Sequence, residues 1–126
     1  MPSAVLDTSA LLALMNREPG ADRVASVLVD AVLSTVNCAE VYTKLSERKM
    51  PSATFDAIIQ VVPTVIDFDI GLARRAGELR AATRHLGLSL GDRACLALAE
   101  REGLPAVTAE RLWGELDIGV TVELIR

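Results

Sequence analysis

The 126-residue sequence contains little of the chemistry on which many enzyme classes depend. It has one histidine, so a histidine-based zinc site or a Ser-His-Asp triad would rest entirely on His85. Its two cysteines, Cys38 and Cys95, are too few for a disulfide framework, and we expect both to be small core residues in a reduced compartment. The sequence has no GxxxxGK[ST] or GxGxxG run, so nucleotide binding by those loops is unsupported.

Long apolar runs and aromatic residues are also scarce. The longest apolar runs are too short to span a bilayer, and no signal-peptide pattern opens the sequence, so we expect a cytoplasmic protein without a membrane span. With two Phe, one Tyr and one Trp, a platform that stacks single-stranded bases is not expected. The net charge of −4 argues against a protein that coats nucleic acid, although it does not exclude a nuclease whose carboxylates hold a cation.

Apolar residues are abundant, at 51% of the sequence, enough for one domain over residues 1–126 with a substantial core. Short β-branched runs predict strands at residues 4–6, 32–35, 64–68, 106–108 and 120–124. Helical patterns lie at residues 11–16, 21–31, 37–48, 52–62, 69–86 and 91–101, with a short helical turn at 112–116. This alternation predicts an α/β fold with a mostly parallel sheet of four to five strands, flanked by helices on both faces.

Four acidic residues follow the predicted apolar segments: Asp7, Glu40, Asp92 and Glu110. In an open α/β sheet, the loops beyond the carboxyl ends of the strands meet in one crevice, so these side chains are expected to converge. Clustered carboxylates repel one another unless a hard cation such as Mg²⁺ or Mn²⁺ neutralises them. The pattern therefore predicts metal-assisted phosphodiester hydrolysis by a nuclease.

Each acid also has a purely structural interpretation. Asp7 could cap a helix, and Glu110 could favour the positive end of a short helix. The segments 37–40 and 89–92 both have the form of a capping box. Hydroxyl groups beside the acids could likewise orient carboxylates and water or serve as caps: Thr8, Ser9, Ser89 and Thr108.

A basic strip lies on the helix predicted at residues 69–86. It consists of Arg74, Arg75, Arg80, Arg84 and His85. The strip is either a solvated helix face or a surface that contacts phosphate groups. Together with Arg93, its arginines are candidates to hold a nucleic-acid backbone.

Four stretches of the sequence resemble the PIN domain family, and within it the VapC-type toxins of bacterial type II toxin–antitoxin pairs. They are VLDTSA at residues 5–10, NCAEV at 37–41, LSLGDRACLALA at 88–99, and a tail with PAVTAERLW at 105–113 that runs into LIR at 124–126. The resemblance covers essentially the whole chain, and the LSLGDR segment is its most specific part. It implies a PIN-like fold and Mg²⁺- or Mn²⁺-dependent endoribonuclease activity that cuts structured RNA and stops translation.

The resemblance also implies roles for individual residues and partners. The metal ligands would be Asp7, Glu40 and Asp92, with Glu110 as the fourth acid of the catalytic cluster. The hydroxyl beside the first acid would be that of Thr8 or Ser9, and Asn37 would be a supporting polar residue. Ser89 is a further supporting candidate because of its place near Asp92. The fourth acid of the family is usually aspartate, so Glu110 is a departure from the pattern. The partners implied are an RNA substrate, a second copy of the chain and a cognate VapB-type antitoxin.

Two other functions compete with this hypothesis. A phospho-acceptor receiver domain would need an acid pair near the first strand and a lysine after the last one, whereas Asp7 stands alone and the only lysines are Lys44 and Lys49. A catalytically weak or silent PIN module would bind RNA or a partner protein without cleavage. Glu110 is the feature that favours the silent module, and metal-dependent cleavage separates it from a nuclease.

Overall fold

The computed structural model describes residues 1–61 and 64–126. Its strands form one five-stranded sheet in the order β3-β2-β1-β4-β5, and every pairing is parallel. The strands are β1 (Ala4–Leu6), β2 (Ala31–Ser34), β3 (Thr64–Ile66), β4 (Ala106–Thr108) and β5 (Val122–Leu124). In the central strand β1, Val5 pairs with Val32 on one side and Ala106 on the other. The predicted α/β class and parallel sheet are confirmed.

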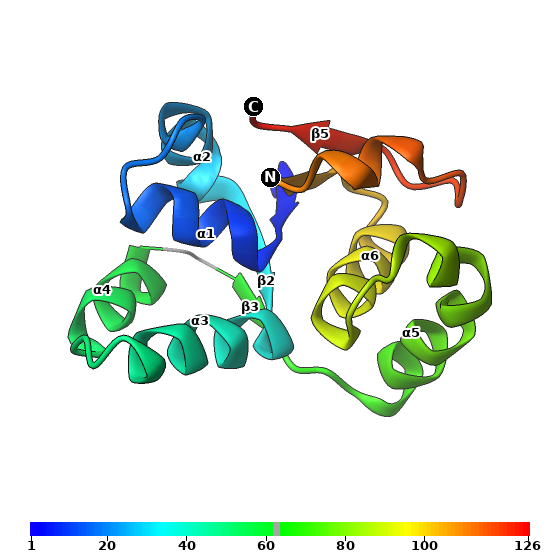
Figure 1. Ribbon diagram of the computed structural model, residues 1–126, viewed down its shortest axis with the longest axis horizontal. Coiled ribbons are helices and arrows are strands. Elements are labelled where there is room, and N and C mark those ends of the chain that lie inside the picture. Colours follow the sequence, from blue (N-terminus) through cyan, green and yellow to red (C-terminus); the bar gives the residue numbers. More distant parts are fainter. Residues whose placement is uncertain (62–63) are drawn as a thin grey trace.

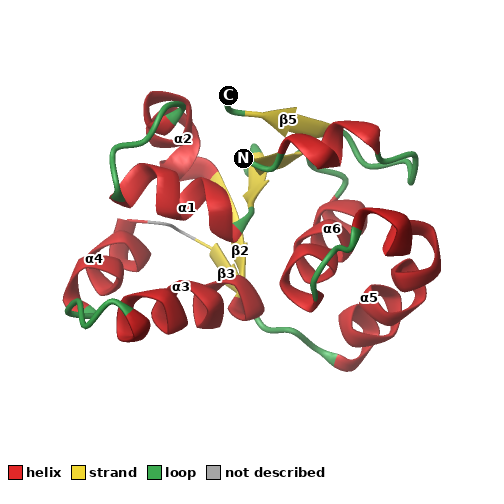
Figure 2. Ribbon diagram, viewed as in Figure 1, coloured by secondary structure: helices red, strands yellow, loops and turns green. Residues whose placement is uncertain are grey.

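Helices cover both sides of the sheet, as Figures 1 and 2 show. One group contains α1 (Thr8–Met15), α2 (Ala21–Val27), α3 (Thr35–Glu47) and α4 (Ala53–Val61), and the other contains α5 (Ile70–Thr83) and α6 (Leu90–Glu102). Because side chains alternate across a strand, Leu6 packs in the core under the first group and Val5 in the core under the second. Helix α6 is buried from residue 94 to residue 99, as its almost entirely apolar sequence predicts.

The junction between β2 and α3 differs from its prediction. The strand ends at Ser34 instead of residue 35, because the Ser34 side chain accepts a 3.2 Å hydrogen bond from the Val36 N–H and caps α3. Asn37 therefore lies inside the first turn of the helix, and the capping box predicted for residues 37–40 is wrong. The capping box predicted for residues 89–92 is confirmed, with both reciprocal hydrogen bonds present.

Several other boundaries also move. The helix predicted at residues 21–31 ends at Val27 and continues as the 3-10 turn η1 (Leu28–Asp30), because Ala31 pairs with Ala4 in the sheet. Helix α1 begins at Thr8 and not at residue 11. Strands β3 and β5 are shorter than the strands predicted at 64–68 and 120–124. Helix α4 corresponds to the helix predicted at 52–62, and the expected last residue of that helix, Val62, lies outside the described residues.

The remaining predictions agree with the structure within a few residues. Helix α3 corresponds to the helix predicted at 37–48, and α6 to the helix predicted at 91–101. The helix predicted at 69–86 is divided into α5 and the 3-10 turn η2 (Arg84–Leu86). The short helical turn predicted at 112–116 is η3 (Arg111–Glu115). Cys38 and Cys95 are free and buried, as expected of core residues. Within residues 1–61 and 64–126, no helix combines the length and apolarity that a membrane crossing requires.

Candidate active site

Residues that follow β1 and β4 meet residues of α1, α3 and α6 around one pocket of about 200 Å³. The described residues that line it are Asp7, Thr8, Ser9, Leu12, Glu40, Lys44, Asp92 and Glu110. The structure thus brings together the four acids singled out from the sequence, although they are spread over most of the chain. Two of the predicted supporting hydroxyl groups line the same pocket.

Asp7 lines the pocket and is 1% exposed. Its Oδ2 accepts hydrogen bonds from the Ser9 hydroxyl at 2.7 Å and the Thr108 hydroxyl at 2.9 Å. Its Oδ1 is buried and has no hydrogen-bond partner among the residues described. Burial, together with the negative charge of Asp92, raises the pKa of Asp7 to about 7, although the hydrogen bonds to its carboxylate act in the opposite direction. The carboxylate is therefore fixed by two hydroxyl groups and has one oxygen free for a cation.

Glu40 reaches the pocket from the second turn of α3. Its Oε1 accepts a 2.5 Å hydrogen bond from the Thr8 hydroxyl and a 3.3 Å hydrogen bond from the Asn37 amide. The same amide of the buried Asn37 donates to the Thr8 hydroxyl at 3.0 Å and to the Gly91 carbonyl at 3.2 Å. Asn37 therefore links α1, α3 and α6 and contacts the Glu40 carboxylate, while the supporting role that the resemblance implies for it remains a prediction.

Gly91 is a site residue that the sequence did not single out. It packs directly against the Glu40 side chain, and a Cβ at residue 91 would overlap all three atoms of the carboxylate group. The glycine in the LSLGDR segment therefore makes room for an acid from another helix. A glycine one residue before a pocket acid was the available signal for this close approach.

Asp92 has a structural role and a place in the pocket at the same time. Its Oδ2 accepts a 2.8 Å hydrogen bond from the Ser89 N–H, and its own N–H donates to the Ser89 hydroxyl at 3.2 Å. The carboxylate thus closes the capping box of α6 while it faces the pocket. Ser89 positions Asp92 and belongs to the cap, and it is not among the described residues that line the pocket.

Glu110 lies at the start of η3 and is exposed. It is the N-cap residue of η3, at the positive end of that short helix as its structural interpretation requires, although its side chain makes no capping hydrogen bond. Its backbone N–H donates to the Thr108 hydroxyl at 3.0 Å, and Thr108 in turn donates to Asp7. The backbone of Glu110 is therefore tied to the first acid, while its carboxylate remains free at the edge of the pocket.

The donor chemistry of the pocket fits a hard divalent cation, because its acids and hydroxyl groups all present oxygen. The unpartnered, buried Oδ1 of Asp7 is the specific observation in favour, since buried polar atoms normally have a partner. Across residues 1–61 and 64–126, however, no group of three or more His, Cys, Asp or Glu side chains forms a ready-made metal site. A complete coordination sphere therefore requires adjustment of side chains or additional oxygen ligands from water or substrate.

The predicted basic residues lie on α5, η2 and α6. The described lining of the pocket does not include any of them: Arg74, Arg75, Arg80, Arg84, His85 and Arg93. Arg75 forms a double hydrogen bond with Glu100, at 2.7 and 2.8 Å, and Arg93 donates to the Ala76 carbonyl at 2.9 Å. These two side chains hold α5 against α6, and a role of the strip in binding RNA remains a prediction.

Sequence reasoning missed two further residues that line the pocket, Lys44 on α3 and Leu12 on α1. Lys44 follows Glu40 by four residues, and Leu12 follows Thr8 by four. Residues with this spacing lie on the same face of a helix. The spacing was therefore a usable signal once Glu40 and Thr8 had been chosen.

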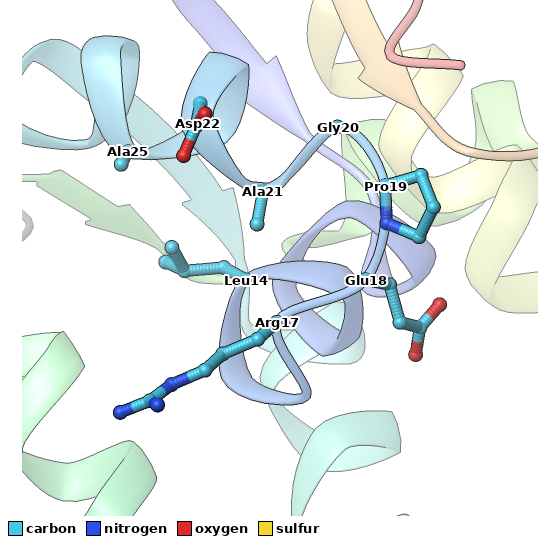
Figure 3. Close-up of a pocket in the computed structure, with 8 residues that line it drawn as sticks. All are labelled: Leu14, Arg17, Glu18, Pro19, Gly20, Ala21, Asp22 and Ala25. Atoms are coloured by element: carbon cyan, nitrogen blue, oxygen red, sulfur yellow. The ribbon is translucent and has the colours of Figure 1, made fainter.

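A larger hollow, of about 690 Å³, lies at the connection between α1 and α2, and its described lining includes none of the four acids of the first pocket. Figure 3 shows its lining, in which the side chains of Arg17 and Glu18 point in opposite directions. Binding sites usually combine an apolar pocket with polar groups that converge on the ligand. The smaller, acid-lined pocket is therefore the better candidate for chemistry.

Comparisons with known proteins agree with this assignment. The model of the PIN domain family matches residues 4–118. Similar solved structures include DNA-bound VapBC from Salmonella typhimurium, at 22% identity and TM-score 0.76 with 100% of each chain covered. VapC20 of Mycobacterium tuberculosis, a sarcin–ricin loop-cleaving toxin, is 26% identical with TM-score 0.70, over 85% of this chain and 88% of that one. A search of functionally curated proteins gives no match.

Proposed function

Because this chain belongs to the PIN domain family, we propose that it is a Mg²⁺- or Mn²⁺-dependent endoribonuclease and the toxin of a toxin–antitoxin pair. PIN domains are generally nucleases. The observation that carries the proposal is the buried, unpartnered Oδ1 of Asp7, which lies in a pocket lined by three further acids. A positive charge stabilises the ionised form of a carboxyl group in such surroundings, and the cation of a metal-dependent hydrolase supplies one.

The named relatives support RNA as the substrate and an antitoxin as the partner. VapC20 cleaves the sarcin–ricin loop, and a similar structure from Klebsiella pneumoniae is a toxin–antitoxin complex, at 21% identity and TM-score 0.75 with 98% of each chain covered. We therefore propose a structured RNA as the substrate, inhibition of translation as the consequence, and a VapB-type antitoxin and a second copy of the chain as partners.

In this proposal Asp7, Glu40 and Asp92 hold the cation, and Glu110 completes the acidic cluster. When bound, the cation supplies positive charge for the phosphate oxygens and lowers the pKa of water. Ser9 fixes the orientation of Asp7 through its hydroxyl, and Asn37 fixes that of Glu40. Both acids are therefore oriented by hydrogen bonds before any ligand arrives, as electrostatic preorganisation requires.

Because the pKa of Asp7 is raised to about 7, its ionisation near neutral pH depends on whether a cation is bound. With a pKa of about 7, the carboxyl group is roughly half protonated near neutral pH in the protein alone. A nearby positive charge favours the ionised form, so cation binding is expected to release a proton from Asp7. Proton release on addition of Mg²⁺ is therefore a second signature of the site, independent of cleavage.

A catalytically weak or silent RNA- or protein-binding module is the second candidate. Two observations favour it: Glu110 is a glutamate that lies exposed at the edge of the pocket, and the described residues form no ready-made metal site. Such a module would retain the fold and the pocket but would not cut RNA.

Cleavage of total RNA and of transfer RNA by antitoxin-free protein separates the two candidates. The reactions contain Mg²⁺, Mn²⁺ or EDTA, and Asp92→Asn serves as the matched control. We expect discrete products that require the cation and are absent with the variant. A folded protein that binds metal but leaves both RNA samples intact would contradict the nuclease and favour the silent module.

A further inference from the structure

Lys44 is the one basic side chain among the described residues that line the acidic pocket. The other polar side chains of that lining are Asp7, Thr8, Ser9, Glu40, Asp92 and Glu110. RNA is a polyanion, and a pocket rich in carboxylates repels it unless positive charge lies close to the path of the backbone. A metal ion neutralises the acids, whereas the ammonium group of a lysine that lines the pocket can bind a phosphate group next to the one at the metal.

The position of Lys44 on α3 suits this task. It follows Glu40 by one turn, and four residues of α-helix rise by about 6 Å, so the two side chains lie on one face at successive levels. The Lys44 side chain is 51% exposed, and its ion pair with Glu47 is long, at 3.6 Å. Because exposed ion pairs of this kind contribute little to stability, the ammonium group is free to change partners.

Other cations are less available to a ligand in the pocket. Arg75 is paired with Glu100, and Arg93 is bound to the Ala76 carbonyl. Arg48 follows the last residue of α3 and is not among the described residues that line the pocket. Lys44 also has no described ion pair with Glu40, Asp7 or Asp92, so it does not already serve as their counter-ion.

We infer that Lys44 binds a phosphate group of the nucleic-acid backbone beside the phosphate that is cleaved. The inference rests on the proposed nuclease function and adds a substrate-positioning residue that neither the sequence motifs nor the acidic cluster contains. A lysine acts here as a flexible point charge, so it recognises the backbone and not the base sequence. Its loss therefore weakens binding of every RNA to a similar degree.

The chain offers a matched control, because its only other lysine, Lys49, lies beyond the end of α3 and outside the described pocket lining. The variants are Lys44→Met, Lys44→Arg and Lys49→Met. Methionine keeps a long unbranched side chain without the charge, and arginine keeps the charge. Binding of fluorescein-labelled transfer RNA is measured over a series of KCl concentrations at fixed Mg²⁺. Asp92→Asn is present in every protein, so that no RNA is cut during the titration.

We expect Lys44→Met to reduce the slope of log Kd against log salt by about 0.7–1, the value for one lost phosphate contact, and to weaken binding by roughly three- to tenfold. Lys44→Arg is expected to restore the slope, and Lys49→Met to match the parent protein. In proteins with Asp92 intact, Lys44→Met should raise KM and leave kcat within about twofold. Unchanged melting temperatures show that the fold is intact.

If Lys44→Met has an unchanged salt slope and the wild-type protein shows metal-dependent cleavage, the assignment of Lys44 is wrong and the proposed function stands. A normal slope with tighter Mg²⁺ binding identifies Lys44 as a counter-ion of the acids and also overturns it. If the wild-type protein neither binds nor cleaves RNA, the proposed function fails and the inference about Lys44 fails with it.

Discussion

Gly91 packs against Glu40 so closely that the missing side chain at residue 91 determines where the carboxylate lies. The Gly91 carbonyl also accepts a hydrogen bond from Asn37, whose amide donates to the Glu40 carboxylate as well. The first turn of α6 and the face of α3 therefore form one cradle for a single acid. A small change on α6 is transmitted to a side chain that is 51 residues away in sequence.

The substitution Gly91→Ala is expected to displace the Glu40 carboxylate. If Glu40 holds the cation as proposed, kcat/KM for RNA cleavage should fall by at least about tenfold, since one oriented acid is lost. The fold should survive, because the atoms that a Cβ would meet are the far end of a flexible side chain. Cleavage assays and thermal unfolding of the same sample measure the two effects. Full activity of Gly91→Ala would show that the position of Glu40 does not matter.

Gly77→Ala is the matched control for this substitution. Gly77 lies in the interior of α5, and a Cβ there meets no atom within 4 Å. Alanine is the better helix former, so the variant should be more stable by about 0.5–1 kcal/mol, with cleavage unchanged. Loss of activity in this control would indicate that any alanine substitution of a helical glycine disturbs the protein.

The convergence of the four acids could be predicted from the sequence, because it depends on a general property of parallel sheets. Strand ends define one edge, and Asp7 and Glu110 follow β1 and β4 at that edge. The burial of α6 was predictable for a similar reason, since its apolar residues cover every face. Both predictions rely on patterns that persist over a whole element.

The role of Gly91 could not be predicted in the same way, because it depends on the distance between two helices, whereas Lys44 could be found only from its spacing to Glu40. The sequence does not state how closely α6 approaches α3, and only that approach makes a glycine necessary at residue 91. Asn37 was misread as a helix cap because Asn37 and Glu40 have the spacing of a capping box, while Ser34 caps the helix three residues earlier. Local patterns of this kind do not reveal which of two nearby polar residues begins the helix.

The double role of Asp92 can be divided by two substitutions. Asp92→Asn keeps an oxygen that accepts the hydrogen bond from Ser89, so we expect less than about 1 kcal/mol of destabilisation, whereas cleavage should be abolished. Ser89→Ala removes the cap and leaves the carboxylate, so it should cost about 1 kcal/mol and retain metal-dependent cleavage.

Urea unfolding and RNA cleavage, measured on both variants, separate the cap from the chemistry. The expected pattern is a stable, inactive Asp92→Asn and a destabilised, active Ser89→Ala. If Asp92→Asn retained full activity, the placement of Asp92 among the metal ligands would be wrong.

The raised pKa of Asp7 predicts an unusual dependence of stability on pH. The pKa is about 7 in the folded protein and near the ordinary value of 3.8 in the unfolded chain, so between these values the folded state binds more protons. The contribution of Asp7 to stability is therefore complete below the unfolded value and is lost as pH rises through about 7. From about pH 5 to about pH 8, the metal-free protein should lose about 2–3 kcal/mol of unfolding free energy.

Asp7→Asn is the control, and it should remove this pH dependence because an amide does not titrate. Mg²⁺ should act in the opposite direction, since it binds the ionised carboxylate and its stabilising effect grows as pH rises through 7. Chemical unfolding with EDTA or with Mg²⁺ across this pH range measures both effects. An identical pH profile for the wild type and Asp7→Asn would mean that the buried carboxyl group does not titrate in this window.

Glu110 is the residue on which the choice between an active and a silent protein depends. Its exposed carboxylate has no described capping bond, so removal of the charge by Glu110→Gln should change stability by no more than about 0.5 kcal/mol. If the fourth acid assists the metal site, cleavage by Glu110→Gln should fall by at least about tenfold, the loss of roughly 1.4 kcal/mol of transition-state stabilisation.

Glu110→Asp then tests the length of the side chain with the charge retained. The backbone N–H of residue 110 is hydrogen-bonded to Thr108, so the backbone keeps its position. The shorter side chain of aspartate therefore places the carboxylate closer to the backbone of residue 110. We expect cleavage at or above the wild-type rate, since aspartate is the usual acid of the family at this position. Full activity of Glu110→Gln would show that three acids suffice. If Glu110→Asp cleaves RNA while the wild-type protein binds metal but does not cleave, the wild-type protein is the silent module.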